Sequence, residues 1–214
     1  MLRLIFPPKC VLCQTILSRN ETDLCHNCRR NPPEFSRAKS SIPFIAHWTA
    51  LWYYKENVRN SIHRFKFGNR RNYAAAYARL LAVRLLEIYP EPFDILTWVP
   101  VSGLRKLKRG YDQSALLAKA VGHELGLPAV SVLKKIRHTP PQSQLKDASQ
   151  RRANILGAYK VRVGQELAGK RILLLDDVIT TGATASECAK MLLSANAKEV
   201  CFAAVAAASH DKNK

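Results

Sequence analysis

The sequence predicts an α/β fold, in which a mostly parallel β-sheet is flanked by helices on both faces. Residues 94–101 (DILTWVPV) and 172–175 (ILLL) are mainly apolar, as expected of strands that are covered on both sides. Residues 73–88 and 185–197 instead carry apolar side chains at helical spacing. Strands that alternate with amphipathic helices are typical of parallel sheets, because each crossover helix packs on a face of the sheet.

The first part of this domain supplies one strand and two helices. Residues 47–54 (HWTALWYY) predict an aromatic-rich strand, and residues 57–67 predict an amphipathic helix that ends at Gly68. The helix over 73–88 is expected to stop before Pro90, because proline cannot continue a helix.

Two features follow the strand at 94–101. Gly110 is expected to begin a further helix with Leu116, Leu117 and Val121 on its apolar face. Residues 137–154 (RHTPPQSQLKDASQRRAN) are polar and contain two consecutive prolines. A long irregular segment in a compact domain is usually a lid or a binding loop, and we expect one here.

Four cysteines near the amino terminus have the spacing of a zinc site. They form C-x2-C-x11-C-x2-C, in which each pair can place two thiolates on one side of a tight turn. Disulfides or redox pairs are the alternatives, but a cytosolic chain disfavours stable disulfides, and a redox C-x-x-C usually occurs singly. A structural zinc would also stabilise a segment too small for its own core. The predicted ligands are Cys10, Cys13, Cys25 and Cys28.

Two domains are expected from these patterns. Residues 1–41 form the zinc module and a linker that begins at Asn31-Pro32-Pro33, and residues 42–214 form the α/β domain. Cys188 and Cys201 are isolated, and we expect them to be small core residues.

The positive charge lies in two blocks. Residues 1–71 carry 13 basic and 4 acidic side chains, and residues 134–171 carry 10 and 2, within a chain of net charge +18. Such blocks favour a polyanionic partner, here single-stranded DNA, although a basic surface can also serve solubility alone. The aromatic residues of 48–54 could stack on bases or pack in the core. The candidate DNA contacts are Arg29, Arg30, Lys66, Arg70, Arg71, Arg105, Lys106, Lys108 and Arg109.

No apolar run reaches the roughly 18 residues of a membrane span, so no membrane insertion is expected. The opening MLRLIFPPKC does not have the pattern of a signal peptide. A cytoplasmic location is the resulting expectation.

The segment ILLLDDVITTGAT (172–184) predicts a sugar-phosphate site. Backbone N–H groups of a glycine turn at a helix start can bind one phosphate, assisted by threonine hydroxyls. The carboxylates of Asp176 and Asp177 suit the vicinal hydroxyls of ribose and can hold magnesium. Together they predict phosphoribosyl pyrophosphate (PRPP) as ligand, with Mg²⁺. The phosphate turn comprises Thr180, Thr181, Gly182, Ala183 and Thr184.

A simple helix cap and the magnesium-binding strand of an ATPase are two other interpretations of this segment. A threonine that merely caps a helix would not account for two adjacent acids before the turn. An ATPase would need a phosphate loop, and residues 164–170 (GQELAGK) match G-x-x-x-x-G-K. However, Arg171 stands where Ser or Thr must bind magnesium, and a strand follows in place of a helix.

The segment 170–184 resembles the signature of type I phosphoribosyltransferases. Residues 99–122 and 133–159, with the four cysteines, resemble the ComF family, phosphoribosyltransferase-like proteins that act in DNA uptake during natural competence. Ser102, Tyr111 and Asp112 depart from that family's usual Pro and Phe-Asn, and Lys55-Glu56 replace a usual glycine.

The resemblance implies a type I phosphoribosyltransferase-like fold with an amino-terminal zinc knuckle, and it implies further site residues. The pyrophosphate turn would comprise Pro100, Val101, Ser102 and Gly103, and the flap would comprise Arg137, Thr139, Gln142, Arg151 and Arg152. A competence helicase or a recombination mediator is an expected partner. No acceptor site stands out, so either PRPP binding without turnover or transfer to an unidentified nucleobase or amine remains open.

Overall fold

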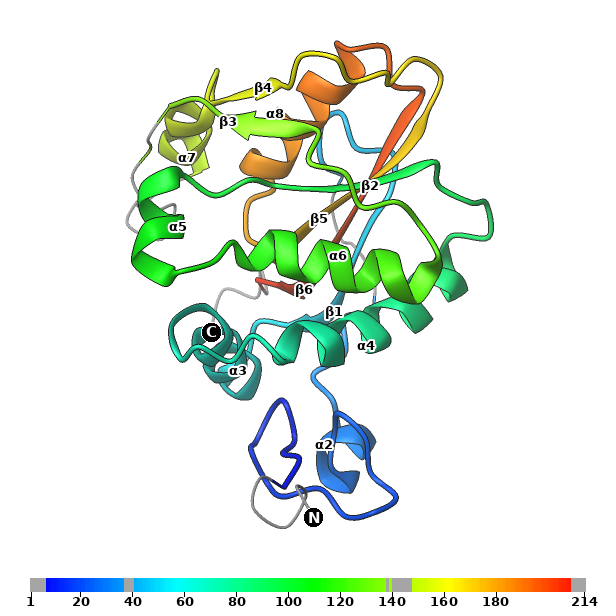
Figure 1. Cartoon of the computed structure of the whole chain (residues 1–214), viewed down its shortest axis with the longest axis vertical. Coiled ribbons are helices and arrows are strands. Elements are labelled where there is room, and N and C mark those ends of the chain that lie inside the picture. Colours follow the sequence, from blue (N-terminus) through cyan, green and yellow to red (C-terminus); the bar gives the residue numbers. More distant parts are fainter. Residues whose placement is uncertain (1–6, 37–40, 138, 140–147, 209–214) are drawn as a thin grey trace.

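The computed structural model describes residues 7–36, 41–137, 139 and 148–208, and it confirms the parallel sheet (Figure 1). Four strands pair in the order β1-β6-β5-β2, all parallel, and β3 pairs with β4 in a separate antiparallel hairpin. The strand bounds are β1 Trp48–Tyr53, β2 Ile95–Trp98, β3 Leu133–Lys135, β4 Tyr159–Val161, β5 Arg171–Ile179 and β6 Glu199–Ala207.

Helices cover both faces of the sheet, as expected. Along β5, Leu173 and Leu175 belong to a core with α3, α4 and α6, whereas Ile172 and Leu174 belong to a core with α8. Within the described residues, none of the helices is long and apolar enough to cross a bilayer. The helix bounds are α2 His26–Arg30, α3 Glu56–Phe67, α4 Tyr73–Ile88, α5 Gly103–Arg109, α6 Gln113–Leu125, α7 Ala148–Ile155 and α8 Ala183–Leu193.

Strand β5 continues beyond the apolar run that predicted it. We expected the strand to end at Leu175, but it extends to Ile179 and carries both carboxylates within its length. The pairing with β6 persists through this part, with Asp176 beside Ala204 and Ile179 beside Ala207. Continuous pairing holds the backbone of the acid pair straight, so the charged side chains are positioned by a strand and not by a loop.

The prediction that Gly110 begins a helix was wrong. Gly110 ends α5 with a left-handed backbone (φ 75°), the conformation that glycine adopts at helix ends. The following helix, α6, starts at Gln113, where the Asp112 carboxylate accepts a hydrogen bond of 3.0 Å from the N–H of Ala115. Asp112, unusual against the ComF pattern, therefore serves here as a helix cap.

Two segments expected to be irregular contain ordered structure. Helix α7 occupies the second half of the predicted loop at 137–154, of which residues 138 and 140–147 lie outside the described residues. The linker pairs with the edge strand β1, because the Phe35 N–H donates to Leu51 O and the Tyr53 N–H donates to Pro33 O. At the opposite edge, Leu96 of β2 forms a bridge with Ala129.

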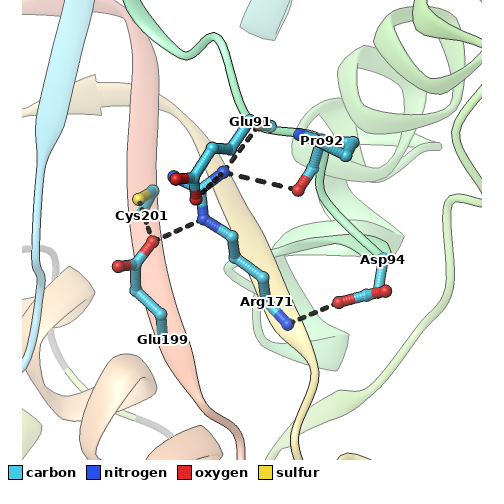
Figure 2. Close-up of polar contacts among 6 residues, drawn as sticks. All are labelled: Glu91, Pro92, Asp94, Arg171, Glu199 and Cys201. Carbon is cyan, nitrogen blue, oxygen red and sulfur yellow. Dashed lines mark hydrogen bonds and ion pairs between the residues drawn. The ribbon is translucent and has the colours of Figure 1, made fainter.

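The amino-terminal ends of the strands are joined by Arg171, as Figure 2 shows. Its guanidinium Nε donates to Glu199 Oε1 on β6 at 2.6 Å, and Nη1 donates to Glu91 O at 2.6 Å. Its backbone N–H donates to Asp94 Oδ2 at 2.7 Å, just before β2. Arg171 thus links β2, β5 and β6 at the edge of the sheet where these strands begin.

The cysteine module has the geometry of a tetrahedral metal site. The four sulfur atoms lie within 4.8 Å of one another, and the Cys13 and Cys25 sulfurs are 3.6 Å apart. A tetrahedral zinc with bonds of about 2.3 Å requires sulfur separations of roughly 3.8 Å, so the cluster fits zinc. Burial raises the pKa of the Cys28 thiol, and the neighbouring thiols raise it further, so a bound cation would stabilise the four thiolates.

This module packs directly against the α/β domain (Figure 1). Val11 and Leu12 are buried in the same core as Ile62 and Phe65 of α3. The Arg64 guanidinium donates to Leu12 O at 2.6 Å, and the Ser61 hydroxyl donates to Val11 O. The zinc module therefore supports α3 and is more than a separate appendage.

Loss of the metal should weaken α3 as well as the module. We expect Cys13→Ser to abolish stoichiometric zinc and to lower stability by about 3 kcal/mol, or roughly 6–12 °C in melting temperature for a chain of this size. Amide hydrogen exchange in α3 should rise, because Ser61 and Arg64 lose their carbonyl acceptors.

Ser18→Ala, an exposed change in the same module, is the matched control and should leave zinc content and melting unchanged. An unchanged exchange rate in α3 after zinc loss would contradict the coupling between the module and the helix.

Candidate functional site

A pocket of about 580 Å³ lies at the carboxyl-terminal ends of the parallel strands. Its walls come from the segments after β1, β2 and β5, from helices α3, α5 and α6, and from the β3-β4 hairpin. Crevices of this kind, beyond the carboxyl ends of strands in an α/β sheet, are the usual ligand sites of such folds. The acid pair and all five residues of the predicted phosphate turn line it: Asp176, Asp177, Thr180, Thr181, Gly182, Ala183 and Thr184.

The two carboxylates have different partners. Asp177 Oδ1 forms an ion pair with Lys66 Nζ of α3 at 2.8 Å. Asp176 Oδ1 accepts hydrogen bonds from the Ser114 hydroxyl at 2.9 Å and from the Asp177 N–H at 2.8 Å. The second oxygen of Asp177 is buried and has no hydrogen-bond partner among the described residues. A buried oxygen without a partner destabilises the fold unless a ligand donates a hydrogen bond to it or a cation binds it. A ribose hydroxyl or magnesium could do so.

Burial makes the acid pair electrostatically costly. The Asp176 side chain lines the pocket, yet its carboxylate is enclosed by protein, and this burial raises its pKa to about 7, with the charge of Asp177 adding to the effect. Lys66 acts in the opposite direction and favours the ionised pair. A carboxyl group with a pKa near neutral pH, such as that of Asp176, can donate a hydrogen bond to a sugar as well as accept one.

The threonine turn leads into α8 through Gly182. This glycine has a left-handed backbone (φ 74°), and a β-carbon placed on it would come within 3.0 Å of the Ile42 side chain. Only glycine fits this position without strain. The first N–H groups of α8 lack partners within the helix, as at any helix start, and they lie at the pocket. The turn is open to the pocket, as a phosphate site requires.

The predicted pyrophosphate turn is divided by the structure. Pro100 and Val101 line the pocket, whereas Ser102 occupies the N-cap position of α5 and Gly103 begins the helix. The Ser102 hydroxyl is buried without a hydrogen-bond partner among the described residues, and the same holds for Gln113 Oε1 in the pocket wall. Ser102 and Gly103 therefore contribute through the start of α5, outside the pocket lining.

A basic wall faces the acid pair across the pocket. Arg105, Arg109 and Lys135 line it, and burial, followed by the charge of Arg105, lowers the pKa of Lys135 to about 8. Lys135 Nζ donates to the Thr139 hydroxyl at 2.8 Å and lies over the Tyr159 ring at 5.3 Å from its centre. The hairpin residues Lys135 and Tyr159 were not predicted. They occupy short strands whose only sequence signal was the apolar-polar alternation of three residues.

The predicted flap residues lie in different places. Thr139 is buried in the pocket wall, and its carbonyl accepts a hydrogen bond from Arg105 at 3.0 Å. Arg137 is exposed and donates to Asn154 O and Leu156 O, outside the pocket lining. Gln142 lies outside the described residues, as do the side chains of Arg151 and Arg152 in α7.

The candidate DNA contacts also separate into two groups. Lys66, Arg105 and Arg109 line the pocket. The aromatic residues of 48–54 are mainly packed, with Trp52 buried and Tyr53 against Phe35. The side chain of Lys108 lies outside the described residues. The remaining five are exposed at the surface: Arg29, Arg30, Arg70, Arg71 and Lys106.

Comparisons with known proteins agree with this organisation. A family model described as "Phosphoribosyl transferase domain" matches residues 112–214, and one described as "Double zinc ribbon domain" matches residues 1–39. "Competence protein F" of Haemophilus influenzae is 33% identical over 183 residues, covering 82% of this chain and 75% of that protein. This chain belongs to the competence protein F family. Its fold is accordingly type I phosphoribosyltransferase-like, with an amino-terminal four-cysteine module.

Other curated relatives also match over much of the chain. "DNA utilization protein YhgH" of Salmonella typhi is 31% identical over 182 residues, covering 82% of this chain and 74% of that protein. "Competence protein ComFC" of Bacillus subtilis is 25% identical over 144 residues, covering 67% of this chain and 57% of that protein. The phosphoribosyl transferase match includes the acid pair and the threonine turn, and the zinc ribbon match includes all four cysteines.

The raised pKa of Asp176 predicts a pH-dependent cost in stability. A carboxyl whose pKa is about 7 in the folded state and 3.8 in its ordinary, solvated state binds more protons when folded at pH values between the two. Folding stability from this group therefore falls as pH rises through that window. We expect Asp176→Asn, which keeps an oxygen acceptor, to stabilise the protein by about 2 kcal/mol or more at pH 8.

That stability gain should shrink when the pH is lowered to 5, as measured by urea unfolding of both proteins. The exposed Glu166→Gln change should produce no comparable pH-dependent difference. A gain that is the same at both pH values would contradict the assignment of the raised pKa.

Proposed function

We propose that this chain is a competence-type accessory protein that binds PRPP in its pocket and handles single-stranded DNA on its basic surface. One observation carries the proposal for the ligand: the acid pair, the glycine turn and a basic wall line the same pocket. The relatives named for competence and for DNA utilization support the biological setting.

Each part of PRPP has complementary groups in the pocket. The N–H groups at the start of α8 and the threonine hydroxyls suit the 5′-phosphate. The unpartnered Oδ2 of Asp177 can accept a hydrogen bond from a ribose hydroxyl. Arg105, Arg109 and Lys135 suit the pyrophosphate. Magnesium, which would accompany the pyrophosphate, would neutralise phosphate charge.

Transfer of the phosphoribosyl group is the alternative function. Its transition state resembles an oxocarbenium ion as pyrophosphate leaves, so the protein must chiefly position the sugar and stabilise the leaving group. The two carboxylates can position the sugar, and the basic wall can stabilise the leaving pyrophosphate. Among the described residues that line the pocket, no side chain identifies an acceptor, so binding is the primary proposal.

The phosphate turn should be essential for ligand affinity. We expect isothermal titration to show binding of PRPP in the presence of magnesium, weakened about tenfold or more by Gly182→Ala. Position 182 has a left-handed backbone, which alanine disfavours, and the added methyl group would lie too close to Ile42. The turn must therefore move away from the phosphate.

Gly164→Ala is the matched control, because Gly164 also has a positive φ (80°) but open space around it and a position outside the pocket. Absence of PRPP binding by the unaltered protein would overturn the proposal. Pyrophosphate release with one nucleobase among a panel would instead establish the enzymatic alternative.

The DNA-handling part rests on exposed charge away from the pocket. Arg29 and Arg30 lie on the zinc module, and Arg70 and Arg71 follow α3. Figure 1 shows that the zinc module is on the α3 side of the molecule, so a single strand could contact both regions. Contacts of this kind bind the phosphate backbone without reading sequence.

Salt dependence should reveal these phosphate contacts. If both basic blocks contact the strand, six or more phosphate contacts predict a log–log slope of about −4 for binding of single-stranded DNA, measured by fluorescence anisotropy. The double change Arg30→Ala with Arg70→Ala should make the slope shallower by about 1.4, since two contacts are lost.

Lys119→Ala with Lys198→Ala removes two exposed charges elsewhere and should leave the slope unchanged. A slope near −1 for the unaltered protein would mean that binding releases only about one counterion. That result would exclude the basic surface from this role.

A further inference from the structure

The acid pair already has a cation beside it. Lys66 Nζ lies 2.8 Å from Asp177 Oδ1, with 21% of the lysine side chain and 6% of the aspartate side chain exposed. Both residues line the pocket, so the pair lies where the ligand would bind. A surface ion pair with this geometry contributes little, but enclosure strengthens the attraction and makes either partner costly to leave alone.

Helix α3 holds Lys66 firmly at this position. Phe65, its neighbour in sequence, is fully buried, and the Phe65 carbonyl accepts a hydrogen bond from the Tyr111 hydroxyl. Arg64, two residues before Lys66, donates to Leu12 O of the zinc module at 2.6 Å. These contacts fix the rotation of the helix, so Lys66 starts from the side of α3 that faces the pocket, where its ammonium reaches Asp177.

The remaining charge of the pair is also compensated from within the chain. Asp176 Oδ1 accepts from the Ser114 hydroxyl and from the Asp177 N–H. A divalent cation bound directly to Asp177 would have to displace Lys66 or lie next to its ammonium group, and like charges at that separation repel. The buried, unpartnered Oδ2 of Asp177 is left as an acceptor that a sugar hydroxyl can complete.

We propose that Lys66 balances the charge of the acid pair in place of a divalent cation, so that the pocket binds the ribose 5-phosphate portion of its ligand without metal. This inference rests on the proposed function, because it presupposes a phosphoribosyl ligand. Magnesium then accompanies only the pyrophosphate, and Lys66 determines which ligands bind: phosphorylated sugars lacking a pyrophosphate are accepted in metal-free solution.

The test is isothermal titration of ribose 5-phosphate with and without magnesium. The buffer is freed of divalent ions by a chelating resin and contains no soluble chelator, so that the zinc module keeps its metal. We expect the unaltered protein to bind ribose 5-phosphate with the same affinity in both buffers. For Lys66→Met we expect about tenfold weaker binding without magnesium and recovery when magnesium is added.

Three further proteins make the test specific. Lys66→Arg should keep metal-independent binding, and Lys119→Met, at an exposed position of α6, should behave as the unaltered protein. Lys66→Met with Asp177→Asn removes both charges and is the second variant if the single change does not fold. It should bind ribose 5-phosphate equally in both buffers, because no uncompensated carboxylate remains at position 177 to attract the metal.

The outcomes distinguish the role of Lys66 from the proposed binding of PRPP. If ribose 5-phosphate binds only with magnesium, or if the double variant becomes magnesium-dependent, Lys66 does not take the cation's place. The same conclusion follows if PRPP with magnesium binds while ribose 5-phosphate binds in neither buffer. If PRPP with magnesium fails to bind at all, the proposed function itself is wrong.

Discussion

The parallel pairing of β5 with β2 and β6 is the constraint on which the pocket depends. Parallel strands end at the same edge of a sheet, so the residues after β2 and after β5 are brought together by the ladder. Arg171 joins the opposite ends of the same three strands, which fixes where they begin. With both ends fixed, the acid pair occupies a defined depth in the pocket wall. The threonine turn can then begin directly at the end of β5, and the basic hairpin lies across the same opening.

The pocket contains buried polar atoms that have no hydrogen-bond partner within the described part of the chain and that a ligand could pair with. Asp177 Oδ2 and Gln113 Oε1, both from residues that line the pocket, are buried without hydrogen-bond partners among the described residues, and so is the Ser102 hydroxyl at the start of α5. Burying such atoms destabilises a fold, so their concentration here is a stored cost that a polar ligand can offset. The same logic explains why Asp176 holds its proton more tightly than an exposed carboxyl. The polar groups of the pocket lower the stability of the fold, and the apolar cores on both faces of the sheet compensate for this loss.

The sequence was most informative where side-chain type and spacing reflect one local geometry. Apolar runs predicted the central strands, four cysteines at fixed spacing predicted the metal cluster, and an acid pair before a glycine turn predicted residues that do line one pocket. It was least informative where position depends on distant segments. Lys135 and Tyr159 reach the pocket only because two three-residue strands pair, and such short strands have too little periodicity to recognise. Lys66 read as one basic residue among many, since nothing local indicates that α3 directs it toward Asp177. Gly110 was misassigned because a glycine between two helical stretches is compatible with the end of one or the start of the next.

The coverage of both sheet margins limits how this protein can associate with others. The segment at 33–35 hydrogen-bonds to the outer side of β1, and the chain around Ala129 does the same for β2. An uncovered margin would be a template on which a strand from another chain could add, leading to aggregation or to a swapped dimer. Where its own backbone occupies these two margins, the four-stranded sheet is protected from strand addition. Recognition at these places would depend on the side chains of the covering segments, which can vary without disturbing the ladder.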